Sequence, residues 1–112
     1  MSLLILAAAL DLLPLGAVRP EGRLLQELQL QRDGLVKHAD DLYPDIAQSD
    51  WVTNASRGGE FSWERGPYYA RGLVALALVL KDDELMKRAQ RWIEAALASQ
   101  RTNGDFGPRD RN

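Results

Sequence analysis

The residues best suited to binding a polar ligand are gathered in the segment GGEFSWERGPYYARGL, at positions 58–73. Trp63, Tyr68 and Tyr69 provide flat aromatic faces, and the tyrosines also carry a polar tip, which suits a ligand with both apolar and polar surfaces. Packing against the core at the start of a helix is the alternative role for these three side chains. The segment therefore predicts either a stacking surface for a ligand or an aromatic cap on the core.

Two charged residues, Glu64 and Arg65, lie between the tryptophan and the tyrosines. A guanidinium presents its donors in a fixed fork, which suits hydroxyl groups or a carboxylate; the alternatives are a local Glu–Arg pair or a solvated charge. Glu64 as a general acid or base would need a second carboxylate about 5 to 10 Å away, and Glu60 and Asp105 are only nominal partners. We therefore name Glu64 and Arg65 as candidate binding residues and name no catalytic residue.

A second polar cluster, NGDF at positions 103–106, follows the last predicted helix. Asn103 and Asp105 are candidate ligand contacts, although Asn103 followed by glycine is also an ordinary turn signal and helix stop. The single histidine, His38, falls on a polar stretch, where a surface position is more common than a base or a ligand. Since the chain also has no cysteine, the sequence predicts no metal site.

Length and composition restrict the classes of protein to which the chain can belong. Its 112 residues make one domain at most. The net charge of −2, with both signs dispersed, argues against a nucleic-acid partner, because phosphate binding needs a concentrated basic face. The apolar runs at 3–10 and 73–80 are far shorter than the roughly 20 residues of a membrane-spanning helix. We therefore expect neither nucleic acid nor membrane as a partner.

Residues 1–10 form a separate apolar segment ahead of the rest of the chain. We interpret this segment as an apolar N-terminal extension or as the remnant of an export signal. The second interpretation would make the protein secreted or periplasmic, but no Lys or Arg precedes the run, as export signals normally require. The location of the protein is therefore left open.

Two helices and a loop are predicted ahead of position 81. Recurring apolar residues predict a helix over 21–41, bent or broken at Gly34 and ended by Pro44. Residues 45–66 show no sustained period and are predicted to be a long loop, of the kind that often serves binding. A second helix is expected from Pro67 to Leu80 with Gly66 as its cap, and it is so apolar that it must be covered on all sides.

A third helix is predicted to begin after Asp82, a good N-cap residue, and to end near Gln100. Its apolar stripe consists of Leu85, Ala89, Trp92, Ile93, Ala96 and Leu97. Only a short polar connection separates the second and third helices, so an antiparallel helical hairpin is expected. The fold class predicted from these patterns is all-α.

Two long stretches of the chain resemble a known family of enzymes. These are DLLPLGAVRPEGRLLQELQLQRDGLVKHADDLYPDI and WERGPYYARGLVALALVLKDDELMKRAQRWIEAALASQRTNGDFGP. They resemble the N-terminal part of the β-L-arabinofuranosidase-like glycoside hydrolases, glycoside hydrolase family 127 and its relatives. The resemblance implies a catalytic domain folded as an (α/α)6 toroid of helical hairpins. It also implies retaining exo-glycosidase activity, with a cysteine nucleophile in a zinc site made of cysteines and a glutamate.

The resemblance implies that residues 11–112 form about the first three helices of such a toroid. They would supply part of its wall and a rim of the sugar site, with carbohydrate as the partner. The family's cysteines and zinc-binding glutamate lie downstream of anything here, so this chain would be inactive by itself and would hold no cofactor, while the complete family enzyme would hold zinc. Another toroid family, such as the unsaturated uronyl hydrolases, shares the helical hairpins but not these motifs.

A function of a different class remains as the alternative. Large apolar surfaces on a small helical chain mark interfaces with other proteins. The chain would then be a small helical module without enzymatic activity, which buries its apolar helix faces by self-association or against a partner.

Overall fold

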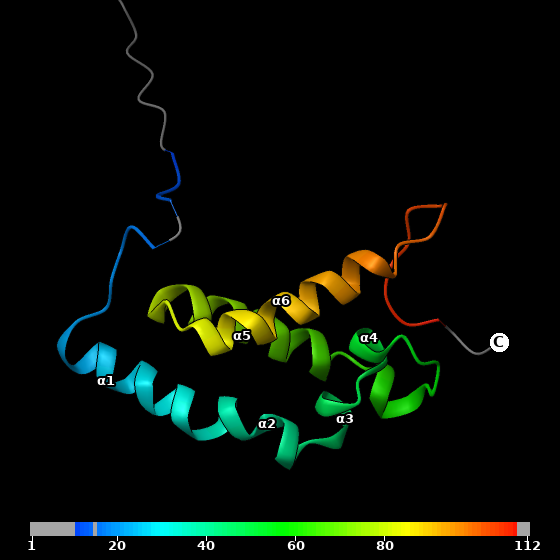
Figure 1. Ribbon diagram of the computed structural model, residues 1–112, viewed down its shortest axis with the longest axis horizontal. Coiled ribbons are helices and arrows are strands. Elements are labelled where there is room, and N and C mark those ends of the chain that lie inside the picture. The colour runs from blue at the N-terminus through cyan, green and yellow to red at the C-terminus, as the bar shows by residue number, and fades with distance from the viewer. Residues whose placement is uncertain (1–10, 15, 110–112) are drawn as a thin grey trace, which may run out of the picture.

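The computed structural model describes residues 11–14 and 16–109, and this part of the chain is all-helical, without a strand (Figure 1). The all-α prediction is therefore confirmed. In chain order the elements are α1 (Gly22–Gln31), a π-helical segment η1 (Arg32–Val36), α2 (Lys37–Leu42), α3 (Pro44–Ala47), α4 (Asp50–Thr53), a 3₁₀ helix η2 (Gly59–Ser62), α5 (Arg65–Leu80) and α6 (Asp83–Ala98). The extension or signal remnant predicted at 1–10 lies outside the described residues.

The first predicted helix is present as α1, η1 and α2 in succession, with a break where glycine predicted one. Gly34 has non-helical backbone angles, φ −86° and ψ −112°, within η1. The helical run ends at Leu42 because Tyr43, which precedes Pro44, is extended with φ −130° and ψ 93°. Both the break at Gly34 and the stop before Pro44 are confirmed.

The prediction of a long loop over 45–66 is wrong, because this segment contains α3, α4 and η2. Helices of four residues are too short to show a hydrophobic period, so periodicity did not reveal them. Two local signals were present all the same. Pro44 takes the first position of α3, and the hydroxyl oxygen of Ser49 accepts a hydrogen bond from the Trp51 N–H at 3.3 Å as the N-cap of α4.

Helix α5 begins two residues earlier than predicted, at Arg65. Gly66 is therefore not the cap residue, and Pro67 is not the first position; both lie in the first turn. Gly66 is buried there because the helix approaches Ser49 and Trp92 too closely for a larger side chain. The start of α5 is thus determined by packing as well as by the local signal from proline.

Helices α5 and α6 pack side by side and run in opposite directions from a two-residue connection (Figure 1). Lys81 turns the chain with a positive φ of 52°. The Asp82 carboxylate then accepts hydrogen bonds from the N–H groups of Glu84 and Leu85, each at 3.0 Å, which confirms Asp82 as the N-cap. Tyr69 and Trp92 meet edge to face across the pair, with ring centroids 5.9 Å apart.

The described residues bury few apolar side chains completely. The buried set is Ala39, Ile46, Leu73, Leu76, Ala77, Leu85, Ala89 and Trp92. Helix α5 contributes to this core on one side only, because Ala75 and Val79 on the opposite side are exposed. The apolar sequence of α5 led us to expect a helix that is covered on all sides. The described part of the chain does not provide that cover.

Candidate ligand-binding site

A polar pocket of about 440 Å³ is formed where α3, η2 and the start of α5 meet. Its lining residues are Asp45, Glu60, Trp63, Glu64, Arg65 and Tyr68. Four of these, Trp63, Glu64, Arg65 and Tyr68, are candidate binding residues from the sequence. The structure therefore brings most of the first candidate cluster together on one concave surface.

Arg65 is held in the polar pocket by an ion pair with Asp45. One guanidinium nitrogen lies 3.0 Å and 2.9 Å from the two carboxylate oxygens of Asp45, whose side chain is buried. The guanidinium carbon also lies 5.4 Å from the centroid of the Tyr43 ring, within range of a cation–π contact. The alternative of a local pair between Glu64 and Arg65 is therefore not what the structure shows: the partner is 20 positions away.

Trp63 and Tyr68 present their rings to solvent, with 68% and 64% of their surfaces exposed. Neither residue is buried in the core, so each ring has exposed surface that can contact a ligand. Tyr69 is different. Its hydroxyl donates to the carbonyl oxygen of Val36 at 3.3 Å and its ring packs on Trp92, although Tyr69 also lines a more open depression together with Arg65 and Tyr68.

The surroundings of the Tyr69 phenol raise its pKa above the ordinary value. Burial is the main cause that raises its pKa, and the nearby charge of Asp40 adds to it. Packing against the core was the alternative role for the three aromatic residues. Of the three, Tyr69 fits that role best.

Asn103 and Asp105 lie apart from the polar pocket, in the exposed turn after α6. The Asn103 amide donates to the Asp105 carboxylate at 2.7 Å, and the Asp105 N–H donates back to the Asn103 side-chain oxygen at 3.1 Å. These two bonds close a turn of the kind that Asn–Gly predicts. His38 is also exposed, with its Nδ1 3.8 Å from a carboxylate oxygen of Asp41.

The loop that carries Glu60 into the polar pocket is anchored to the start of α4. We call residues 57–62 the anchored loop. The Asp50 carboxylate accepts hydrogen bonds from Ser62 Oγ at 2.7 Å, the Gly58 N–H at 2.9 Å and Arg57 Nε at 3.2 Å. Burial by itself raises the pKa of Asp50, but these three bonds outweigh it, so the pKa lies below its ordinary value.

The two residues beside Asp50 hold the same loop. The Ser49 hydroxyl donates to the Phe61 carbonyl at 3.2 Å, and the Trp51 indole N–H donates to the Ser62 carbonyl at 3.1 Å. Sequence reasoning missed Ser49, Asp50, Asp45 and Tyr43. Only Ser49 had a local signal, as a helix cap, because the other contacts join residues that are far apart in the chain.

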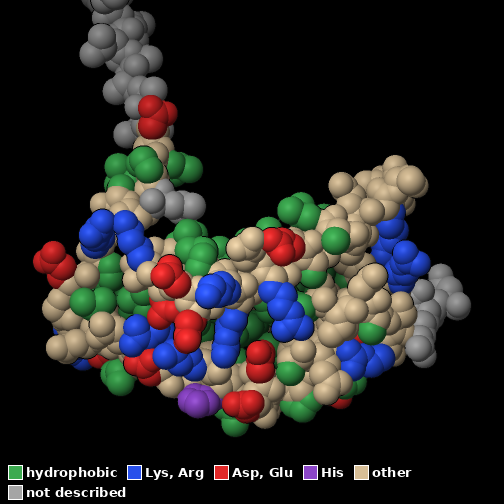
Figure 2. Space-filling view, viewed as in Figure 1, with side chains coloured by type: hydrophobic (Ala, Val, Ile, Leu, Met, Phe, Trp, Pro, Cys, Tyr) green, Lys and Arg blue, Asp and Glu red, His purple; other side chains and the backbone are tan. Residues whose placement is uncertain are grey.

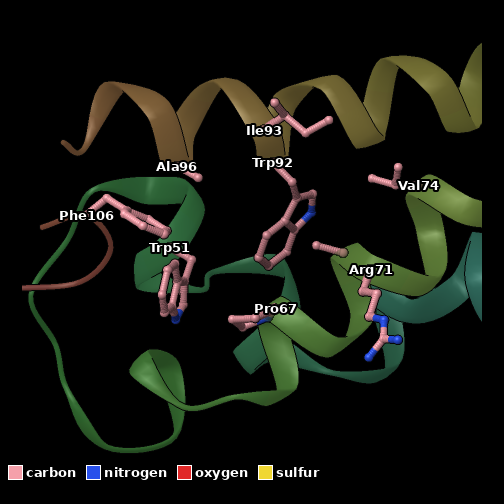
Figure 3. A pocket seen from close by; sticks show the side chains of 9 residues that line it. Trp51, Pro67, Arg71, Val74, Trp92, Ile93, Ala96 and Phe106 are labelled. Carbon is pink, nitrogen blue, oxygen red and sulfur yellow. The ribbon is translucent and has the colours of Figure 1, made fainter. Parts of the chain in front are cut away.

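An apolar groove of about 410 Å³ lies on the α5–α6 pair (Figure 3). It is lined by Trp51, Pro67, Ala70, Arg71, Val74, Trp92, Ile93, Ala96 and Phe106. The rings of Trp51 and Trp92 project into it, and Phe106 meets Trp51 edge to face with ring centroids 6.5 Å apart. Ile93 and Leu97, which belong to the predicted apolar stripe of α6, are exposed beside this groove.

Charges of both signs are interspersed over the face shown in Figure 2, where His38 appears in purple. Within residues 11–14 and 16–109, no group of three or more acidic or histidine side chains is placed to hold a metal ion. In the same part of the chain, no helix combines the length and apolarity needed to cross a membrane.

Comparison of the chain with protein-family models, with curated proteins and with solved structures gives no match.

Proposed function

We propose that this chain supplies part of the wall and one sugar-binding rim of a larger helical domain, the (α/α)6 toroid of a β-L-arabinofuranosidase-like glycoside hydrolase. In this proposal residues 11–112 are about the first three helices of that domain. The polar pocket binds carbohydrate, and the chain has no glycosidase activity of its own.

The observation that carries the proposal is the arrangement of side chains in the polar pocket. Trp63 and Tyr68 offer exposed aromatic faces, which suit the C–H surface of a sugar ring. Arg65 lines the same pocket and is held by Asp45, so its remaining N–H groups meet a ligand hydroxyl at little cost in side-chain entropy. Glu60 and Glu64 add acceptors for hydroxyl groups on the same surface.

The exposed apolar surface supports the second half of the proposal, that further helices cover this chain. Helix α5 leaves Ala75 and Val79 exposed, and the apolar groove beside it is open. Exposed apolar patches of this kind mark surfaces that contact other protein segments. In a toroid, those segments would be neighbouring helices of the same domain.

Zinc does not fit the residues that the structure describes. The chain has no cysteine, and its described residues assemble no group of metal ligands. We therefore place neither the nucleophile nor the metal here, and the contribution that we propose for this chain is binding and wall formation.

Sugar binding by the polar pocket is tested by titrating the 112-residue chain with methyl arabinofuranoside and an arabinofuranosyl disaccharide. The Trp indole N–H resonances serve as the readout. We expect Trp63→Ala to weaken binding by about tenfold or more, because an aromatic face loses its contact area with the sugar. Phe106→Ala is the matched control, since Phe106 is also an exposed aromatic residue, at 60%, but lies outside the polar pocket.

Equal binding by wild type and Trp63→Ala would contradict the proposed site, as would the absence of binding to every arabinofuranoside. A galacturonide in the same panel distinguishes the uronyl hydrolase alternative. Hydrolysis of the bound sugar by the isolated chain would overturn the expectation that it is inactive alone.

The alternative proposal is a small helical module that self-associates without enzymatic activity. The apolar groove is the observation that favours it, because Ile93, Leu97 and Phe106 expose a connected apolar surface along α6. A second copy of the chain would then cover the groove in place of further helices.

A further inference from the structure

We propose that Asp50 is a positioning residue for the polar pocket: it holds the anchored loop in the conformation that presents Glu60 and Trp63 there. This inference rests on the function proposed above, because it assigns a role in the same site. Asp50 itself does not line the polar pocket.

The donors to the Asp50 carboxylate all belong to one segment of the chain. Asp50 is 2% exposed, and the donors that reach its two oxygens belong to Arg57, Gly58 and Ser62, all in the anchored loop. A buried carboxylate is costly unless it is paired and hydrogen-bonded, so these three donors are what keep it in place. The dependence is mutual, since the loop is held by the same bonds.

The conformation of the anchored loop depends on bonds from outside the loop. Gly58 and Gly59 have positive φ values of 73° and 57°, and the loop has no strand or long helix to stabilise it. Glycine loses more conformational freedom on ordering than any other residue, so such a segment needs external bonds to stay in one conformation. Asp50 supplies three of them at the start and the end of the loop.

The anchored loop is linked directly to the residues that face the polar pocket. Ser62 is bonded to Asp50 through its hydroxyl and to the Trp51 indole through its carbonyl, and Trp63 follows it directly. Glu60 lies in the middle of the loop, between two anchored positions. Without the Asp50 bonds, the loop would keep the bonds from Ser49 and Trp51 but would hold Glu60 and Trp63 less firmly in the polar pocket, while α5 and α6 stay in place.

Asp50→Asn is the sharpest substitution, because it preserves shape and changes only the bonding. Both carboxylate oxygens accept hydrogen bonds, whereas the amide of asparagine places a donor against Arg57 on one side or against Gly58 and Ser62 on the other. Ser62→Ala is a milder variant that removes a single donor. It keeps the test valid if Asp50→Asn fails to fold.

The experiment measures amide hydrogen exchange by NMR in the 112-residue chain, residue by residue. We expect Asp50→Asn to speed exchange at Gly58 by about tenfold or more relative to the buried amides of α5 and α6, with a smaller increase in Ser62→Ala. Leu85→Ala is the control for general destabilisation, since Leu85 is buried in the core and should speed exchange throughout. Asp41→Asn, at an exposed carboxylate, controls for the change of charge.

The same variants are titrated with the arabinofuranosides, and we expect Asp50→Asn to weaken binding by at least about tenfold. Equal acceleration of exchange in the loop and in the core would overturn the inference, because Asp50 would then be an ordinary stabilising residue. Selective loop opening with unchanged sugar affinity would also overturn it. Selective opening in a chain that binds no sugar would leave the anchoring of the loop intact and would refute the proposed function instead.

Discussion

Arg65 shows how the chemistry of a single residue depends on a partner that its neighbours in sequence do not reveal. Its guanidinium and the adjacent aromatics suggested a binding surface, and Glu64 was the obvious local partner. In the structure Arg65 is paired with buried Asp45 and lies against Tyr43. An arginine held in this way presents its free donors in one direction, which a solvated arginine does not.

Gly66 is a residue whose small size is required by packing. A Cβ atom at this position would lie 2.8 Å from Ser49 Oγ and 3.0 Å from the Trp92 ring, and both neighbours are buried. We predict that Gly66→Ala destabilises the chain by about 1–3 kcal/mol through overpacking, measured by urea unfolding.

Gly72→Ala is the matched control for Gly66→Ala on the same helix. Gly72 is exposed, and a Cβ atom there would have no heavy atom within 4 Å. Because alanine is a better helix former, we expect this substitution to stabilise the chain by about 0.5–1 kcal/mol. If the two substitutions changed stability by the same amount, the close packing of Gly66 would not be important for stability.

The lowered pKa of Asp50 makes the folding stability of the chain depend on pH. Its pKa in the folded chain lies below the ordinary value of 3.8, so the unfolded chain binds the proton more tightly. The stabilisation is therefore complete at neutral pH and is lost as the pH falls below about 4 through the folded pKa. We expect the free energy of unfolding to decrease over this range, as followed by urea titrations at several pH values.

Asp33 titrates in a similar range, since its hydrogen bond with Arg32 is the main cause that lowers its pKa to about 2. The difference between wild type and Asp50→Asn isolates the contribution of Asp50. A difference that stays constant between pH 6 and pH 3 would show that the carboxylate charge of Asp50 does not stabilise the fold.

At the level of elements, the start of α6 follows a local capping rule, whereas the start of α5 also depends on packing. Asp82 caps α6 through two N–H groups, and its carboxylate also lies 3.5 Å from Arg32. We predict that Asp82→Ala destabilises the chain by about 1–2 kcal/mol, as measured by the shift in the urea midpoint.

Asp83→Ala is the control for the cap, because Asp83 lies in the first turn of α6 but is not its N-cap. It should cost no more than about 0.5 kcal/mol, through the helix dipole alone. If both variants lost the same free energy of unfolding, the negative charge at the start of α6 would account for the effect, and the capping bonds of Asp82 would not.

At the level of the whole molecule, the balance between buried and exposed apolar side chains is the main feature. The core is small, while Leu97, Phe106 and Ile93 remain exposed along one side of α6. The described chain thus has a surface that favours contact with other protein segments. Both proposed functions use this surface, and they differ in what covers it.

We predict that the chain self-associates at high concentration through the apolar groove. Leu97→Glu should lower the average mass measured by light scattering after size exclusion, because Leu97 is 70% exposed beside the groove and a charge there disfavours burial. Leu24→Glu, at an exposed leucine on α1, is the control and should have a smaller effect.

The size distribution of the associated species distinguishes between the two proposed functions. A defined dimer that melts cooperatively would favour the self-associating module, whereas a broad range of sizes would favour a wall that lacks its neighbouring helices. A wild-type chain that stays monomeric at every concentration would show that the groove does not bind a second copy.

The sequence by itself determined the helical class, the break at Gly34, the stop before Pro44 and the cap at Asp82. The helical class follows from the period of apolar residues along each helix, and the other three features depend on residues within a few positions of one another, through backbone sterics or a capping bond. Only the tertiary structure decided that Asp45 holds Arg65, that Asp50 anchors the loop before Trp63, and that the Tyr69 ring packs while the Tyr68 ring is exposed. Those outcomes depend on which distant surfaces meet when the helices pack, and a pattern of neighbouring residues carries no information about that.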